Sequence, residues 1–169
     1  LADQVRSGDP GNVEAQAARL YWSRTLGRGV GRQPAAGQLI GANACLDYGY
    51  AVLRGHLMRA VLAAGLAPAL GVFHRGRGNA FALADDLIEP FRPAIDEVAL
   101  PPPATASPSD REVKQLLVAA ASQRFDADGH GVPAVAEALA QSFGRYIEGD
   151  IDRLQVASWQ GPSRVGVGD

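Results

Sequence analysis

The chain has 169 residues, 47% of them hydrophobic, and a formal net charge of −2. This size and composition indicate one folded domain and exclude a disordered protein. The sequence also has no apolar run near membrane-spanning length, and its single cysteine, Cys45, cannot form an internal disulfide. We therefore expect a cytoplasmic protein without a membrane partner.

The first half of the sequence predicts two helices. Helix-forming residues occupy 13–26, with Asn12 as the expected N-cap and Gly27 at the end. Glycine and proline recur through 28–42, which predicts a loop. A longer helix is expected at 43–64, because apolar residues recur there every three or four positions. We expect this helix to form the centre of the fold.

The second half predicts further helices and no strands. A helix begins near residue 79, is interrupted at Pro90 and Pro93, and resumes over 94–100. The segment 101–109 reads as a linker within one domain. Two more helices are expected, one with Ser109 as its cap that runs to about residue 124 and one over 133–148. The prediction is an all-α fold of about six helices, with a domain at 1–154 and a flexible tail at 155–169.

Three acids precede the first proline of this interrupted helix: Asp85, Asp86 and Glu89. Their spacing places at least two carboxylates on one side of a helix, where like charges repel and favour a nearby cation. Pro90 ends the helix directly after Glu89 and so directs that side chain. One interpretation is a solvated acidic face that is neutralised by arginines. The candidates for that role are Arg75, Arg77 and Arg92.

A second interpretation combines these acids with Glu14 and His74. Carboxylates and an imidazole from three separate segments are typical ligands of a hard divalent ion, Mg²⁺ or Mn²⁺. Nearby arginines would bind phosphate oxygens. This combination indicates phosphoryl transfer on nucleic acid.

Two segments of the sequence resemble a known protein family whose chemistry agrees with this hypothesis. "GNVEAQAARLYW" and "NACLDYGYAVLRGHLMRAVLAAGLAPALGVFHRGRGNAFALADDLIEPFRPAID" resemble the C-terminal catalytic domain of the CRISPR-associated integrase, especially the versions of type II systems. Members of this family are metal-dependent endonucleases that insert spacers during CRISPR adaptation. The resemblance runs in order over residues 1–154. Family members also carry an N-terminal β-sandwich domain, for which we expect no counterpart in these residues.

The resemblance implies particular roles for particular residues. The family's three metal ligands match Glu14, His74 and Glu89, which are also the expected catalytic residues. Asp86 matches an acid beside the site and is a secondary candidate ligand. Motif positions that face the site or DNA match Asn43, Tyr48 and Arg92.

The resemblance also implies a function. The expected reaction joins 3′-hydroxyl ends of a protospacer to the CRISPR repeat by transesterification, and with water as the nucleophile the same site becomes a nuclease. Expected partners are double-stranded DNA, a second copy of the chain and a small ferredoxin-like adaptation protein, in a prokaryotic cytoplasm. Candidate DNA-binding residues are Arg19, Arg54, Arg59, Arg75, Arg77 and Arg92. The alternative is a catalytically idle helical module for DNA binding or assembly.

The segment "DADGHGVPAVAE", residues 126–137, resembles a calcium-binding EF-hand loop. Asp126, Asp128, His130 and Glu137 occupy ligand positions of that pattern. Histidine is a poor Ca²⁺ ligand, and Pro133 replaces a residue that normally contributes an amide, so a polar loop between helices is the favoured interpretation. Cys45, Tyr21 and Trp22 are expected to pack against the core.

Overall fold

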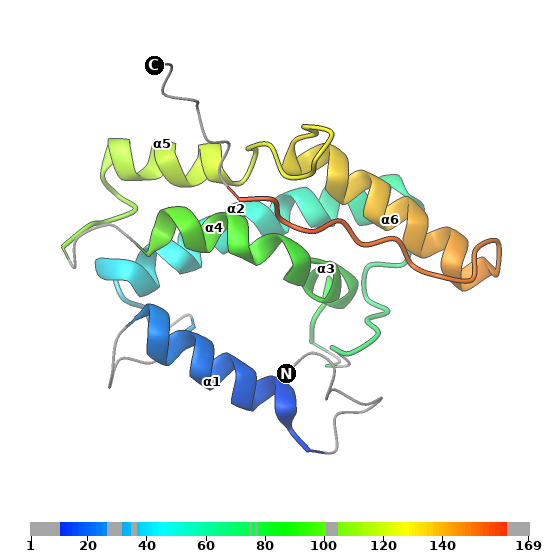
Figure 1. Cartoon of the computed structure of the whole chain (residues 1–169), viewed down its shortest axis with the longest axis horizontal. Helices are drawn as coiled ribbons and strands as arrows, with labels where there is room; N and C mark the ends of the chain where they lie inside the picture. The colour runs from blue at the N-terminus through cyan, green and yellow to red at the C-terminus, as the bar shows by residue number, and fades with distance from the viewer. Residues whose placement is uncertain are drawn as a thin grey trace.

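The computed structural model describes residues 11–26, 32–34, 37–74, 76, 78–100 and 105–161, and of Glu14 the backbone alone. Within these ranges the chain forms six α-helices and one short 3-10 helix, with no strand beyond an isolated bridge between Arg124 and Gly131. Figure 1 shows them in order from blue to red. The prediction of an all-α fold is confirmed.

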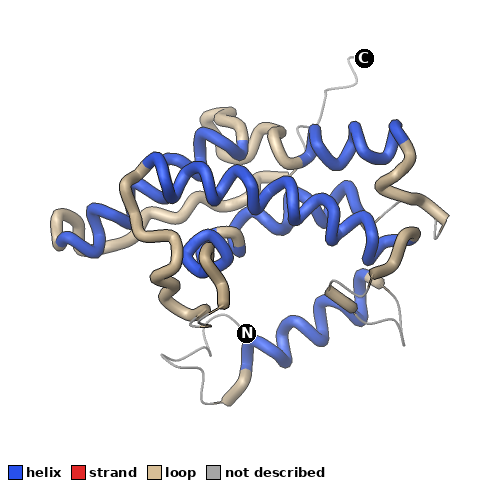
Figure 2. The backbone as a smooth tube through the Cα atoms, turned by 180° about the vertical axis from the view of Figure 1, so that it is seen from behind, coloured by secondary structure: helices blue, strands red, loops and turns tan. Residues whose placement is uncertain are grey.

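Helix α2, Gly41–Ala63, is the centre of the fold, as predicted. Helices α3, α4, α5 and α6 all contact it (Figure 2). One stripe of α2 faces these neighbours because its apolar residues recur every three or four positions. The members of the stripe are buried: Leu46, Tyr50, Leu53, Leu57 and Val61. Cys45 lies beside them, fully buried as expected, and burial raises the pKa of its thiol.

The close approach of α2 to α4 depends on a glycine. A Cβ atom at Gly49 would lie 2.5 Å from the Cγ2 atom of Ile95. We expect Gly49→Ala to destabilise the protein by about 1–3 kcal/mol, because the core would have to shift. Gly55, six residues later on α2, has no atom within 4 Å of its Cβ direction. Gly55→Ala should be neutral or stabilising by up to about 1 kcal/mol, as glycine disfavours a helix interior.

Urea denaturation of the two variants tests this difference. Equal stabilities for Gly49→Ala and Gly55→Ala would contradict the packing of α2 against α4.

The remaining helices close the core around α2. Helix α5, Arg111–Ala120, and helix α6, Val132–Glu148, lie close to their predicted positions. The N-cap of α5 is Asp110, so the predicted capping role of Ser109 is wrong. No described helix is both long enough and apolar enough to cross a membrane.

The packed part of the domain extends beyond the predicted boundary at residue 154. The segment after α6 returns along the bundle (Figure 1), where the Trp159 ring lies 5.6 Å from the ring of Phe125. Gln160 donates its backbone N–H to the carbonyl of Phe125 at 3.3 Å. Residues 159 and 160, which the prediction assigns to the tail, therefore contact the core through one aromatic ring and one backbone hydrogen bond.

Helix α1, Val13–Thr25, lies at the edge of the molecule in both views (Figures 1 and 2). None of its described side chains is buried. Trp22, on α1, and Leu26, which follows it, are partly buried and pack against the core. Asn12 occupies the N-cap position, as predicted, but it adopts a left-handed conformation and its side chain makes no capping bond. Trp22 thus packs against the core, as predicted, whereas Tyr21 lies more exposed at its rim.

Candidate active site

The predicted break in the acidic helix is present and sets the geometry of the site. Helix α3 covers Ala82–Leu87, the 3-10 helix η2 covers Glu89–Phe91, and helix α4 covers Arg92–Ala99. Helix α3 thus ends before Glu89 and not directly after it, and Glu89 begins a tighter turn that contains Pro90. The prediction of a second interruption at Pro93 is wrong. Pro93 lies in the first turn of α4, where a helix needs no N–H donor.

The first of the three acids, Asp85, is bound by Arg54. The Arg54 Nε atom lies 2.5 Å from Oδ1 of Asp85, and the Asn79 amide donates to Oδ2 at 2.7 Å. Burial alone would raise the pKa of Asp85, but these two hydrogen bonds hold it below its ordinary value. The guanidinium of Arg54, a candidate for DNA contact, is therefore already paired with the Asp85 carboxylate.

The second acid, Asp86, organises the segment that carries His74. Its carboxylate accepts three backbone N–H groups, from Val72, Phe73 and His74. Its Oδ1 atom also lies 2.7 Å from Nδ1 of the His74 ring. Although burial acts to raise the pKa of Asp86, these bonds hold it below its ordinary value. An ionised carboxylate only accepts hydrogen bonds, so the Nδ1 atom carries the proton and leaves Nε2 as the acceptor.

Gly71 permits this arrangement. A Cβ atom there would lie 2.2 Å from the carbonyl oxygen of His74 and 2.9 Å from Oδ2 of Asp86. The segment can therefore fold tightly over the carboxylate only with glycine at this position. His74 remains 46% exposed while Asp86 is 8% exposed, so the imidazole is presented on the surface by a buried support.

The third acid, Glu89, pairs with Arg92 one turn later. The Nε atom of Arg92 lies 2.9 Å from both oxygens of Glu89. The guanidinium also lies over the ring of Tyr50, 4.5 Å from its centroid. Glu89 itself is 53% exposed. Two of the three acids thus pair with arginines, as the solvated-face interpretation expects, whereas Asp86 binds a histidine and backbone.

A groove of about 610 Å³ separates Glu89 from helix α1. Ala17, Ala18 and Tyr21 line it from α1, and Glu89 and Arg92 line it from the opposite side. Position 14 lies one turn before Ala17 and Ala18 on α1, and its side chain lies outside the described part of the chain. The structure brings His74 and Asp86 together, and the convergence of Glu14, His74 and Glu89 remains a prediction.

Sequence analysis did not identify a buried carboxylate at the floor of this groove. Asp96, on α4, is 5% exposed. The hydroxyl of Tyr21 donates to its Oδ2 atom at 2.6 Å, and the hydroxyl of Tyr50 donates to Oδ1. Burial raises the pKa of Asp96, and the two hydrogen bonds offset only part of that effect. Burial likewise raises the pKa values of both tyrosines.

The remaining basic candidates divide into two groups. Arg19 and Arg59 are exposed, whereas Arg75 and Arg77 lie outside the described residues. Arg32, which was not predicted, is partly buried in the groove wall, where it binds Asp47 at 2.5 Å and the Asn43 side chain at 3.0 Å. Asn43 is itself buried, and Tyr48 is partly buried against the core. Asn43 thus positions the loop before α2.

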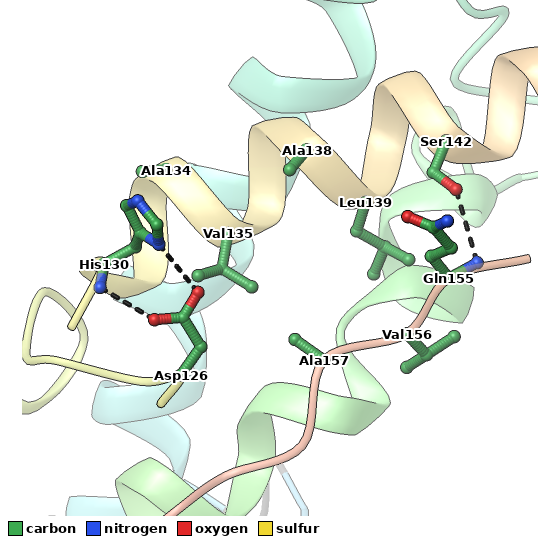
Figure 3. Close-up of a pocket in the computed structure, with 10 residues that line it drawn as sticks. All are labelled: Asp126, His130, Ala134, Val135, Ala138, Leu139, Ser142, Gln155, Val156 and Ala157. Carbon is green, nitrogen blue, oxygen red and sulfur yellow. Dashed lines mark hydrogen bonds and ion pairs between the residues drawn. The ribbon is translucent and has the colours of Figure 1, made fainter. Parts of the chain in front are cut away.

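The loop that resembles an EF-hand has a different geometry. The backbone of an EF-hand turns sharply at the sixth-position glycine. That glycine, Gly131, has a φ of −74°, and the left-handed residue here is Gly129. The Asp126 carboxylate instead binds the backbone N–H and ring of His130, both at 2.8 Å (Figure 3). The interpretation as a polar loop between helices therefore fits, and the calcium-sensor interpretation does not.

The same loop contains three potential metal-binding side chains whose ligand atoms all lie within 4.8 Å of one another: Asp126, Asp128 and His130. Within the described part of the chain, no other three such side chains lie this close together. The loop lies beside a groove of about 520 Å³ between α6 and residues 155–157 (Figure 3). This groove shares no lining residue with the groove beside Glu89.

Two histidines outside the His74 segment should titrate in a defined order. The hydrogen bond and charge of Asp126 raise the pKa of His130, whereas burial and the nearby Arg59 lower the pKa of His56. We expect His130 to lose its proton at the higher pH when the imidazole signals are followed by NMR. In Asp126→Asn the His130 value should fall towards that of a free histidine. Coincident titrations of His130 and His56 would contradict the Asp126–His130 contact.

Comparison with solved structures defines the class of fold. The chain aligns with the structure titled "Casposase bound to integration product" with a TM-score of 0.71 over 87% of this chain and 49% of that one, at 19% sequence identity. The helical fold is thus that of a domain within a larger protein. The family model for CRISPR associated protein Cas1 matches residues 11–101, more than half of the chain. The chain therefore belongs to the Cas1 family, and the recognition from its motifs is confirmed.

Curated relatives agree with this family. The CRISPR-associated endonuclease Cas1 of Neisseria meningitidis serogroup C (strain 8013) is 50% identical over 96 residues, which are 57% of this chain and 30% of that protein. CRISPR-associated endonuclease Cas1 2 of Pyrobaculum aerophilum is 28% identical over 153 residues, which are 87% of this chain and 51% of that protein. The chain thus spans about a third to a half of these relatives.

Proposed function

We propose that this chain is the catalytic domain of a metal-dependent DNA endonuclease and integrase of CRISPR adaptation. The observation that carries the proposal is the pairing of His74 with Asp86, which leaves Nε2 of an exposed imidazole as a free ligand atom. Membership of the Cas1 family supports the same conclusion, and its relatives are named endonucleases.

The donor set fits a hard divalent ion. We propose Glu14, His74 and Glu89 as the ligands, with Asp86 as the support of His74 in preference to a direct ligand. Asp86 suits that role because four hydrogen bonds already occupy its oxygens. Carboxylate oxygens with one imidazole nitrogen suit Mg²⁺ or Mn²⁺. The ion, when bound, stabilises the negative charge that develops on phosphate oxygens.

Residues of the chain would also position the reacting groups of the DNA. Arg92 neutralises Glu89 in this structure and lies at the edge of the groove, where its guanidinium can turn towards a phosphate. A 3′-hydroxyl of the protospacer forms the new P–O bond, the attacked phosphodiester of the repeat breaks, and the proton passes to the departing oxygen. With water in place of the hydroxyl, the products are those of an endonuclease.

The proposed partners follow from the same reaction. Double-stranded DNA would contact exposed arginines such as Arg19 and Arg59, so its affinity should fall steeply with salt. The casposase structure, which has the same fold, is described as bound to an integration product. We propose a homodimer and a small ferredoxin-like adaptation protein as further partners of the whole protein.

A nicking assay on supercoiled plasmid tests the proposed function. The chain should convert the plasmid to its open-circular form with Mn²⁺ and not with EDTA. The second candidate function, an idle module for DNA binding or assembly, is favoured by the pairing of Glu89 with Arg92, which leaves that acid neutralised. DNA binding without nicking in Mn²⁺ would support that alternative and contradict the proposed function.

A further inference from the structure

Helix α1 depends on few contacts for its position. None of its described side chains is buried, and the groove separates much of its inner face from α2 and α4. Partial burial of Trp22 and Leu26 secures its carboxyl-terminal end. A helix with so little buried apolar surface opens easily from its domain. A single strong polar contact therefore matters more here than in the core.

Tyr21 makes such a contact with Asp96. Its hydroxyl donates to Oδ2 of the buried carboxylate at 2.6 Å, over a sequence separation of 75 residues. The other oxygen of Asp96 accepts from Tyr50, on α2. A buried carboxylate needs hydrogen-bond donors, and here two different helices supply them. Asp96 thus joins α1 and α2 to α4.

The position of Tyr21 links this contact to the proposed site. Residues 14 and 21 are two turns apart on one face of α1, about 10 Å along its axis. Asp96 lies one turn after Arg92 on α4, and Arg92 binds Glu89. Helix α1, which carries position 14, therefore meets α4 at Tyr21 and Asp96, and Glu89 lies on η2 directly before α4.

We propose that Tyr21 and Asp96 are positioning residues, whose hydrogen bond docks α1 on α4 and thereby sets the separation of Glu14 from Glu89. This inference rests on the proposed function, since it requires both carboxylates to bind one ion. Neither Tyr21 nor Asp96 touches the ion or the DNA in this account. They act through Glu14.

Tyr21→Phe is the variant of choice, because Tyr21 is 40% exposed and the substitution removes only the hydroxyl. Amide hydrogen exchange should become about tenfold faster across α1 and stay unchanged in α2, since a hydrogen bond to a charged group contributes about that factor or more. The dissociation constant for Mn²⁺, measured by calorimetry, should rise about tenfold as well. Tyr146→Phe, at a 45% exposed tyrosine on α6, should change neither quantity.

A double-mutant cycle separates positioning from general destabilisation. Glu14→Ala should weaken Mn²⁺ binding on its own, and Tyr21→Phe should have no further effect in that background, because Tyr21 acts only through Glu14. Unchanged exchange in α1, unchanged Mn²⁺ affinity in Tyr21→Phe, or additive effects in the cycle would each overturn the inference while the ligand set stands. If Glu14→Ala alone leaves Mn²⁺ affinity unchanged, the proposed ligand set fails, and the positioning role fails with it.

Discussion

Replacing His74 with alanine should reduce Mn²⁺-dependent nicking of supercoiled DNA by about 10²- to 10³-fold, the cost of losing one group that stabilises transition-state charge. The imidazole is 46% exposed and Asp86 binds its Nδ1 atom, so the loss of Nε2 should act on the reaction and not on the fold. Thermal stability should therefore change little. Plasmid nicking and thermal denaturation, measured on the same preparation, give both quantities.

His56→Ala is the matched control, because His56 lies on α2 and is not one of the proposed ligands. It should nick DNA at the rate of the unmodified chain. Nicking that survives His74→Ala undiminished would rule out this histidine as a ligand.

Asp86→Asn should reduce nicking by about 10- to 100-fold, the usual effect of losing the carboxylate that supports a metal-binding histidine. An amide has only one acceptor oxygen, so it cannot accept the three backbone N–H groups and the His74 ring together. The Asp86 side chain is only 8% exposed, so the unfolding free energy should also fall by about 1–3 kcal/mol when its hydrogen bonds are lost. Initial nicking rates at saturating Mn²⁺ and chemical denaturation measure the two effects.

Asp85→Asn controls for the loss of a charge at the neighbouring position. Asp85 binds Arg54 and Asn79 and makes no contact with His74 among its hydrogen bonds, so nicking should stay within about threefold, the spread typical of substitutions away from a site. Equal losses of activity in Asp85→Asn and Asp86→Asn would mean that nicking depends on the negative charge at these positions. That result would contradict the role of Asp86 in orienting His74.

Most of the helical framework could be predicted from the sequence. The apolar spacing of α2 is regular enough to identify both the helix and its buried face, from Leu46 to Val61. The end of α3 also followed from local chemistry, because proline constrains the backbone directly before it. Helix α1 starts at Val13 with Asn12 at its N-cap position, as predicted, whereas the N-cap of α5 is Asp110 instead of Ser109. Ser109 and Asp110 both have side chains that can cap, so residue type alone does not define the start of α5 to within one residue.

The sequence indicated which residues belong to the candidate site, but it did not indicate which partner each of them binds. The three acids before Pro90 were treated as one cluster, yet Asp85, Asp86 and Glu89 have three different partners. Arg92, three residues after Glu89, was among the expected partners, but the partners of Asp85 and Asp86 lie 31 and 12 residues away, so no local pattern could assign them. Asp96 was missed for the same reason. Its one sequence signal is an acid beside the buried apolar residues Ile95 and Ala99.

The central claim is that Glu14, His74 and Glu89 bind a single divalent ion, and a crystal structure of the chain soaked with Mn²⁺ tests it most directly. Anomalous scattering should locate one ion in the groove between α1 and the start of α4, with an oxygen of Glu14, Nε2 of His74 and an oxygen of Glu89 at about 2.0–2.3 Å. An ion that is found only at the Asp126, Asp128 and His130 loop, with Glu89 still bound to Arg92, would contradict the account.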